Sequence, residues 1–376
     1  MTKKNSIDKI FLGIVLALVV VGLIAFTSAS LGILARNEKI FYDVIFKQYL
    51  FGFLGGIVAM YIGYKIPYKF FRKNSLILFI LSIALTALVL VPGIGESHGG
   101  ARRWINILGY SFQPVEFLKI GFIIYFSAWL SWAKAKVKDP LFSILPLVVL
   151  LGIIAGVLLK QPDTKSIILI TITAIVMLFI SGTPIKYLLG IFGVAIICFA
   201  ILVSFTPYLK DRVNTFLKPN ENARGASYQL QQSLIAVGSG GITGRGLGQS
   251  IQKFNYLPEP QGDSIFAVIG EELGFVGCAI LICLYLSFAL RGYRIAIRNA
   301  PDPFAKILVV GFITIITAQS FMNIASIIGV FPLTGVPLVF ISHGGTALLL
   351  SMGMMGVVLN ISKYNGKPIL EKKQGN

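Results

Sequence analysis

The repetition of long apolar segments, separated by short polar links, restricts this chain to very few folds. A helix needs about 20 mostly apolar residues to cross a bilayer, and it pairs its backbone polar groups within itself. About ten segments meet this condition: residues 10–30, 46–64, 75–91, 115–132, 141–159, 166–180, 185–205, 264–290, 307–328 and 338–359. The sequence therefore predicts an all-α, polytopic membrane protein with about ten transmembrane helices.

The composition agrees with that class and argues against nucleic-acid binding. Hydrophobic residues make up 56% of the chain and charged residues only 13%, against the ~25% that is usual in soluble domains. The formal net charge is +18, yet the basic residues are spread through the links between apolar segments, without a nucleic-acid-binding motif. The expected surroundings are membrane lipids, with no nucleic acid.

The distribution of lysine and arginine predicts the orientation, because cytoplasmic links carry an excess of both. With the N-terminus inside, the opposite short loops hold far fewer basic residues. The basic cytoplasmic links are then the tail 1–9, residues 65–73, 133–140, 186 and 291–306, and the tail 360–376. We predict one domain, residues 1–376, with both termini cytoplasmic and a large extracytoplasmic loop, 206–263, between helices seven and eight.

The large loop ends in the acid that is the best candidate for chemistry. Asp263 stands where the loop meets an apolar segment, and Pro258, Pro260 and Gly262 favour a turn there. A carboxylate partly withdrawn from water has a raised pKa and can act as a general base. The glycine cluster within 238–248 lacks the spacing of a nucleotide-binding loop and indicates a compact loop on the membrane surface.

Two further polar pairs have two interpretations each. Glu116 and Lys119 share one helical face at the outer start of an apolar segment. They either pair near the headgroups or face a polar cavity, where Lys119 would attract an anionic headgroup and Glu116 would orient it. Arg103 and Trp104 either anchor the chain at the membrane interface or bind a ligand.

Three other features can be explained by a structural role. Asp163 is a possible N-cap of the following helix, and His343 fits polar packing. The segment 329–345 carries two prolines and several glycines, which disfavour a continuous spanning helix and favour a broken or re-entrant element.

Long ordered motifs reveal a family resemblance over nearly the whole chain, to about Leu359. In order along the chain they read GARRWINILG with QPVEFLK, QPDTKS, DRVNTFLKP, YQLQQSLIAVGSGGITGRGLGQSIQKFNYLPEPQGDSIFAVIGEELGFVG and GVFPLTGVPLVFISHGGTALL. The chain resembles the SEDS family of integral-membrane peptidoglycan glycosyltransferases, which includes FtsW, RodA and SpoVE. The run QSLIAVGSGG…GLGQSIQK is more similar to the division-type FtsW than to the elongation-type RodA.

The resemblance implies roles for single residues. Asp263 falls on the essential acid of the family and is the expected catalytic residue. The expected substrate-binding residues fall on the other motifs: Arg103, Trp104, Gln113, Glu116, Lys119, Asp163, Arg212, Ser342 and His343. The chain departs from the family pattern at Val115, where a serine is usual, at Lys165, where a glycine is common, and at His343, where tyrosine is usual. These departures keep the acid and the basic residues, and therefore bear on substrate detail.

The implied activity is polymerisation of lipid II into glycan strands on the outer face of a bacterial cytoplasmic membrane, for septal wall synthesis during cell division. The implied partners are a class B penicillin-binding transpeptidase and other division proteins. No tightly bound cofactor is expected, although a divalent cation, Mg²⁺ or Mn²⁺, could assist the charge on the pyrophosphate.

Two alternatives come from other functional classes. A lipid II flippase would also use intramembrane charges and broken helices, but it needs polar groups through the full thickness of the membrane. The charges at Glu116, Lys119, Asp163 and Asp263 all fall at the predicted outer edge. A scaffold that recruits division proteins would leave this outer cluster unexplained. The sequence therefore favours the polymerase.

Overall fold

The computed structural model describes residues 6–98, 101–107, 109–218, 225–298, 300 and 302–364. Among these residues, nine helices are long and apolar enough to cross a membrane, which confirms the polytopic all-α prediction. They are α1 (Lys9–Leu34), the continuous helix Glu38–Lys65, α6 (Pro114–Ala133), α7 (Pro140–Leu158), α8 (Thr164–Ser181), α9 (Ile185–Phe205), α12 (Ile265–Arg298), α13 (Pro303–Ile327) and α14 (Gly345–Ser362).

Several predicted segments differ from the helices that form, and α12 extends eight residues beyond the predicted end at 290. The helix Glu38–Lys65 begins before the predicted segment 46–64 and is built from α2 (Glu38–Lys47), the π-helix η1 (Gln48–Leu54) and α3 (Gly55–Lys65). The predicted segment 75–91 forms α5 (Ser75–Leu88), whose 14 residues are shorter than a usual span. The last predicted segment, 338–359, is helical only from Gly345, because the prolines and positive-φ glycines before it break the helix.

Shorter elements complete the described chain. A small antiparallel sheet, ordered β1-β2-β3, consists of β1 (Gly95–His98), β2 (Ala101–Ile107) and β3 (Tyr110–Phe112). The remaining helical elements are α4 (Tyr68–Lys73), η2 (Lys134–Lys138), α10 (Pro207–Leu217) and α11 (Ala226–Ser239). The last two lie in the predicted loop 206–263. The tail residues 1–5 and 365–376 lie outside the described residues.

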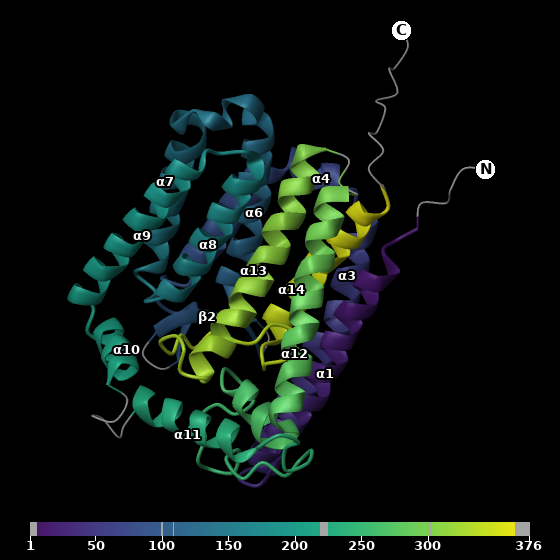
Figure 1. The fold of residues 1–376 in the computed structure, drawn as a ribbon, viewed down its shortest axis with the longest axis vertical. Coiled ribbons are helices and arrows are strands. Elements are labelled where there is room, and N and C mark those ends of the chain that lie inside the picture. Colours follow the sequence, from purple (N-terminus) through teal and green to yellow (C-terminus); the bar gives the residue numbers. More distant parts are fainter. Residues whose placement is uncertain are drawn as a thin grey trace.

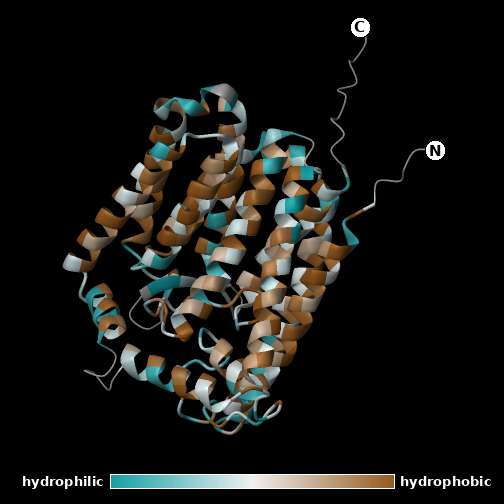
Figure 2. Ribbon diagram, viewed as in Figure 1, coloured by the Kyte–Doolittle hydropathy of each residue, from teal (hydrophilic) through white to brown (hydrophobic). Residues whose placement is uncertain are grey.

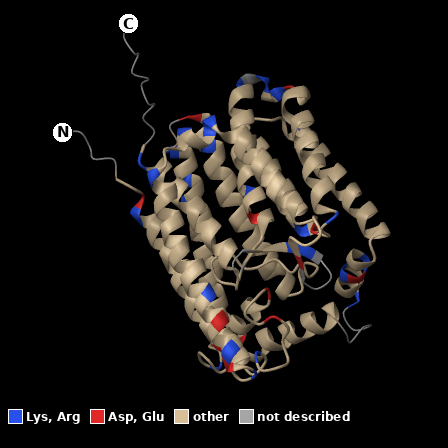
Figure 3. Ribbon diagram, turned by 180° about the vertical axis from the view of Figure 1, so that it is seen from behind, with Lys and Arg blue, Asp and Glu red and all other residues tan. Residues whose placement is uncertain are grey.

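Helix α13 occupies the centre of the bundle. Of its apolar window, 83% is buried, against 6% for α9 at the periphery. It packs against α12, α8 and α6, while α14 packs along α3 and α1 packs along α12 (Figure 1). Apolar residues cover the outer helices between more polar ends (Figure 2). Basic residues gather at the end of the bundle where both termini lie (Figure 3).

The glycine cluster folds around a kink in α12. Gly274 interrupts the helix with φ 65° and ψ −163°, and a Cβ on Gly244 would lie 2.2 Å from the Glu272 carbonyl oxygen. The N–H groups of Arg245 and Gly246 donate to the carbonyls of Glu271 and Glu272 at 3.0 and 2.9 Å. The compact loop predicted for this cluster is confirmed, since only glycine permits so close a backbone approach.

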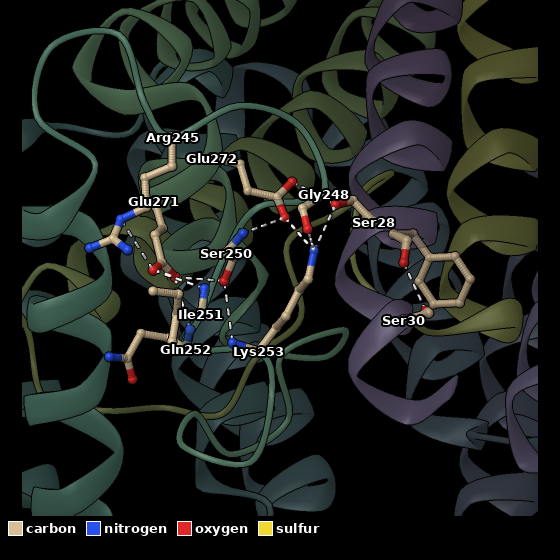
Figure 4. A network of polar contacts seen from close by, with 11 residues as sticks. Ser28, Ser30, Arg245, Gly248, Ser250, Ile251, Gln252, Lys253, Glu271 and Glu272 are labelled. Atoms are coloured by element: carbon tan, nitrogen blue, oxygen red, sulfur yellow. Dashed lines mark hydrogen bonds and ion pairs between the residues drawn. The ribbon is translucent and has the colours of Figure 1, made fainter. Parts of the chain in front are cut away.

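A buried polar network holds the same loop to the helices (Figure 4). Lys253 Nζ lies 2.6 Å from Glu272 Oε1, with both side chains at most 3% exposed, and Ser28 Oγ on α1 donates to Glu272 Oε2 at 2.6 Å. Glu271 accepts from the Ser250 hydroxyl at 2.5 Å and from two loop N–H groups. Both carboxylates are therefore paired, and they fix the loop that leads to Asp263.

Candidate active site

Asp263 lies directly before Ser264 and the first turn of α12, behind a turn in which Glu259 has a φ of 46°. Its Oδ1 accepts from Gln229 Nε2 on α11 at 3.2 Å. The Asp263 carbonyl accepts from Asn323 Nδ2 on α13 at 2.7 Å, and the same amide nitrogen donates to the Val336 carbonyl at 2.8 Å. Three segments far apart in sequence therefore fix the position of this acid.

The segment around Gly335 brings two basic residues to the acid. Arg212 on α10 donates through Nη1 to the Leu333 carbonyl at 2.5 Å, and Lys165 on α8 donates through Nζ to the Gly335 carbonyl. A Cβ built on Gly335 would lie 3.3 Å from Asp263 Oδ2 and 3.5 Å from Arg212 Nη2. Glycine at this position, with φ +61°, leaves room for the acid and the guanidinium beside the same backbone segment.

Burial dominates the electrostatics of the acid. It raises the pKa of Asp263 above the ordinary carboxyl value, and the nearby Lys165, the Gln229 hydrogen bond and Arg212 offset only part of that rise. Burial also raises the pKa of Glu259, and the charge of Asp263 adds to that effect. The carboxyl group of Asp263 is therefore a stronger proton acceptor than an exposed aspartate.

A cavity of about 110 Å³ adjoins this cluster. Three basic residues line it, together with apolar and aromatic side chains: Arg103, Lys165 and Arg212, with Ile168, Phe199, Tyr208, Leu209 and Phe331 among the others. Arg103 on β2 is held by the backbone before α8, since its Nε donates to the Gln161 carbonyl at 3.0 Å and its Nη2 to the Pro162 carbonyl. The cavity thus combines anion-binding groups with an apolar wall.

The pair Glu116 and Lys119 is an ion pair, as one of the two interpretations predicted, but it lies in the protein interior. Lys119 Nζ is 2.7 Å from Glu116 Oε2, and the Lys119 residue is 3% exposed, so it does not extend to the headgroups. Lys119 Nζ also donates to Gln319 Oε1 on α13 at 2.8 Å. Gln319 is one turn from Asn323, which holds Asp263, so the two polar groups share a face of α13.

Two other predicted residues flank this region. Asp163 stands before α8 and is fully buried; it makes no side-chain cap to the backbone, and its Oδ2 accepts from Ser166 Oγ at 2.8 Å. Its Oδ1 has no hydrogen-bond partner among the described residues. Asp163 therefore occupies the predicted N-cap position of α8, but its side chain does not cap a backbone N–H. Gln113 is buried directly before α6.

The remaining predicted residues have mainly packing contacts. Trp104 is half-buried on β2, opposite Glu96. The Ser342 hydroxyl accepts from the Leu338 N–H at 2.8 Å. His343 stacks on Phe26 with ring centroids 5.8 Å apart, and its backbone N–H donates to the Gln261 carbonyl at 2.7 Å. A role for these residues in substrate binding stays a prediction.

Sequence reasoning missed several residues of the cluster. Gln229, Asn323 and Gly335 are separated from Asp263 by tens of residues, and nothing local in their motifs indicates that they meet it. Lys165 stood out only as a departure from a motif. Lys165 is the second residue of an apolar helix, where a lysine without a partner is costly in hydrocarbon. This cost is the sequence signal that could have identified it as a functional residue.

The fold and the site define a multi-pass membrane protein with a half-buried acid near basic groups. The chain belongs to the FtsW/RodA/SpoVE family of cell cycle proteins, whose family model matches residues 8–367. It is 38% identical to stage V sporulation protein E of Bacillus subtilis (strain 168), over 97% of this chain and 99% of that protein. It is 37% identical to the probable peptidoglycan glycosyltransferase FtsW of Trichlorobacter lovleyi, over 94% of this chain and 93% of that protein.

Solved structures agree with the fold. A chain from a peptidoglycan synthase complex that coordinates polymerization and crosslinking superimposes with a TM-score of 0.78 and 25% identity, covering 95% of this chain and 97% of that chain. RodA of Thermus thermophilus superimposes with a TM-score of 0.68 and 23% identity, covering 96% and 97%. The predicted family and the polytopic helical fold are confirmed.

Proposed function

We propose that this protein is a peptidoglycan glycosyltransferase that polymerises lipid II into glycan strands. The observation that carries the proposal is the half-buried Asp263, whose Oδ2 lies next to Gly335 as Arg212 Nη2 does, near a cavity with an apolar wall. A proton acceptor next to anion-binding groups suits a transfer in which a hydroxyl attacks and a pyrophosphate leaves. The relatives named peptidoglycan glycosyltransferase support the same reaction.

The reaction can be assigned to these groups as follows. The sugar 4-hydroxyl of the acceptor attacks the anomeric carbon of the donor, and its proton passes to the Asp263 carboxylate. The bond from the anomeric carbon to the pyrophosphate oxygen breaks, and undecaprenyl pyrophosphate leaves with the bonding electron pair. Arg103, Lys165 and Arg212 stabilise the charge that develops on this leaving group. The apolar wall of the cavity suits the start of the polyprenyl chain.

Removing one of these basic groups gives a direct test. Lys165→Met takes a half-buried ammonium from the cavity, and hydrogen bonds to charged groups are worth about 1.5–3 kcal/mol. We expect kcat/KM for lipid II polymerisation to fall about 10- to 100-fold. Lys160→Met removes a charge from an exposed lysine nearby and serves as the matched control. Equal activity of the two variants would contradict a role for Lys165.

The pH dependence gives a second test. Asp263 accepts a proton only when it is ionised, and burial raises its pKa. The rate should therefore fall as the pH drops through this raised pKa, at a higher pH than the ordinary carboxyl range. The measurement is kcat/KM against pH with labelled lipid II. An acid limb at the ordinary carboxyl pKa would argue against Asp263 as the base.

Location and partners complete the proposal. The basic end of the bundle, which carries both termini, would face the cytoplasm, and Asp263 would face outward. We assign the protein to the bacterial plasma membrane at the division septum, with a class B transpeptidase and other division proteins as partners. The similarity to a chain of a polymerization and crosslinking complex supports such a partner.

We also propose that a divalent cation assists the reaction at this site. Among the described residues no group of three or more His, Cys, Asp or Glu side chains forms a metal cage. Mg²⁺ in phosphate-transfer sites is often held by one or two carboxylates plus substrate phosphates, and Asp263 could supply such a carboxylate. When bound, Mg²⁺ or Mn²⁺ would neutralise charge on the pyrophosphate.

A further inference from the structure

A second cavity, of about 410 Å³, lies at the opposite end of the bundle from the acid, where both termini lie. It is formed between the start of α1, the last turns of α12 and Ser362 at the end of α14. Its lining holds four basic side chains, Lys9, Arg291, Arg294 and Arg298, and a single carboxylate, Asp8. The cavity is therefore strongly cationic.

The carboxylate of Asp8 already has partners within the protein. Asp8 Oδ2 lies 2.8 Å from Arg291 Nη2, and Arg291 Nε donates to Asp8 Oδ1 at 3.1 Å. Asp8 Oδ1 also caps α1 by accepting from the Phe11 N–H at 2.9 Å. The exposed side chains of Arg294 and Arg298 make no hydrogen bond or ion pair to another residue of the described part of the chain. Two guanidinium groups therefore remain available to an anion.

Apolar side chains flank the same cavity on the outer surface. Ile10, which lines the cavity, is 59% exposed, and Ile297, between Arg294 and Arg298 in sequence, is 69% exposed. These residues belong to the ends of two helices that are long and apolar enough to cross a membrane, and helix ends lie near the headgroups. The excess of basic residues in cytoplasmic links explains the charge, but it does not require a cavity with an apolar edge.

We propose that this cavity binds the headgroup of an anionic phospholipid of the cytoplasmic leaflet. Arg294 and Arg298 would bind the phosphate, since guanidinium groups match the geometry of phosphate oxygens. The acyl chains would lie along Ile10 and Ile297. Basic pockets between transmembrane helices on the cytoplasmic side recognise anionic lipids in this way.

Lipid binding to the purified full-length protein in detergent tests this proposal. Native mass spectrometry would give the dissociation constants of phosphatidylglycerol and of phosphatidylcholine for the wild type and two double variants. In Arg294→Gln/Arg298→Gln the cavity loses two charges. In Lys136→Gln/Lys138→Gln two exposed lysines are lost from a link at the same end of the bundle. Thermal unfolding without lipid would check that both variants are folded.

We expect the wild type and the lysine variant to prefer phosphatidylglycerol, and the arginine variant to bind it about 30-fold more weakly. Equal binding by the two double variants would overturn the proposal. Glycerol 3-phosphate serves as a soluble competitor in the same experiment, because it carries the phosphate without acyl chains. If it displaces the lipid at equal concentration, the cavity is a site for soluble phosphates and the lipid assignment is wrong.

Discussion

Asp263→Asn should remove glycan polymerisation while leaving the protein folded and inserted. Asparagine keeps the shape of the side chain and its hydrogen bond from Gln229, but it cannot accept the proton of the attacking hydroxyl. Loss of a general base lowers rates by about 10²–10⁴-fold. The measurement is the initial rate of strand formation from labelled lipid II, with Asp211→Asn, an exposed carboxylate of the same loop, as the matched control.

The stability of the same variant separates chemistry from unfolding. The folded-state pKa of Asp263 is raised, so its contribution to stability is greatest at low pH and falls as the pH rises through that pKa. A neutral asparagine avoids the buried charge, and the variant should unfold at the same or a higher temperature than the wild type at neutral pH. Full activity of Asp263→Asn, or a well-folded Asp211→Asn with equal loss, would contradict the assignment.

Lys253→Met should cause the largest loss of stability among single substitutions in the loop. It leaves the carboxylate of Glu272, 2% exposed, without its cation 2.6 Å away. Breaking a buried pair by removing one partner costs about 3–5 kcal/mol, because an uncompensated charge stays buried. The expected result is a large fall in the unfolding temperature in detergent, with loss of polymerisation as the loop before Asp263 loosens.

Two variants complete this test. Lys47→Met breaks the exposed pair with Asp43 and should cost no more than about 1 kcal/mol. Lys253→Met combined with Glu272→Gln removes both charges and should recover part of the stability. If Lys253→Met were as stable as Lys47→Met, the network would not hold the loop.

The membrane helices could be predicted from the sequence because each span is a local property. Segments such as α7 and α9 match their predicted ranges to within one or two residues, since apolar length alone defines them. The short sheet β1-β2-β3 was missed, because its strands are only three to seven residues long and lie between two apolar segments. The break before α14 was predicted, because Pro332 and Pro337 cannot sit in an uninterrupted helix.

The active-site cluster could be predicted only in part. Asp263 stood out because of its place at the end of the loop, and Arg212 and Arg103 through family motifs. The contacts that position the acid join residues 34 and 60 positions apart, to Gln229 and Asn323, and such separations have no signal in one sequence. Of the two interpretations of Glu116 and Lys119, the structure shows the ion pair, to which Gln319 on α13 adds a hydrogen bond.

A polymerase joins lipid II into glycan strands, whereas a transporter moves lipid II across the membrane unchanged. We would reconstitute the purified protein in vesicles with labelled lipid II, with and without a class B transpeptidase and Mg²⁺, and measure both strand length and lipid II translocation. We expect glycan strands from the wild type, none from Asp263→Asn, and no translocation that depends on the protein. Translocation of lipid II without polymer under every condition would contradict it.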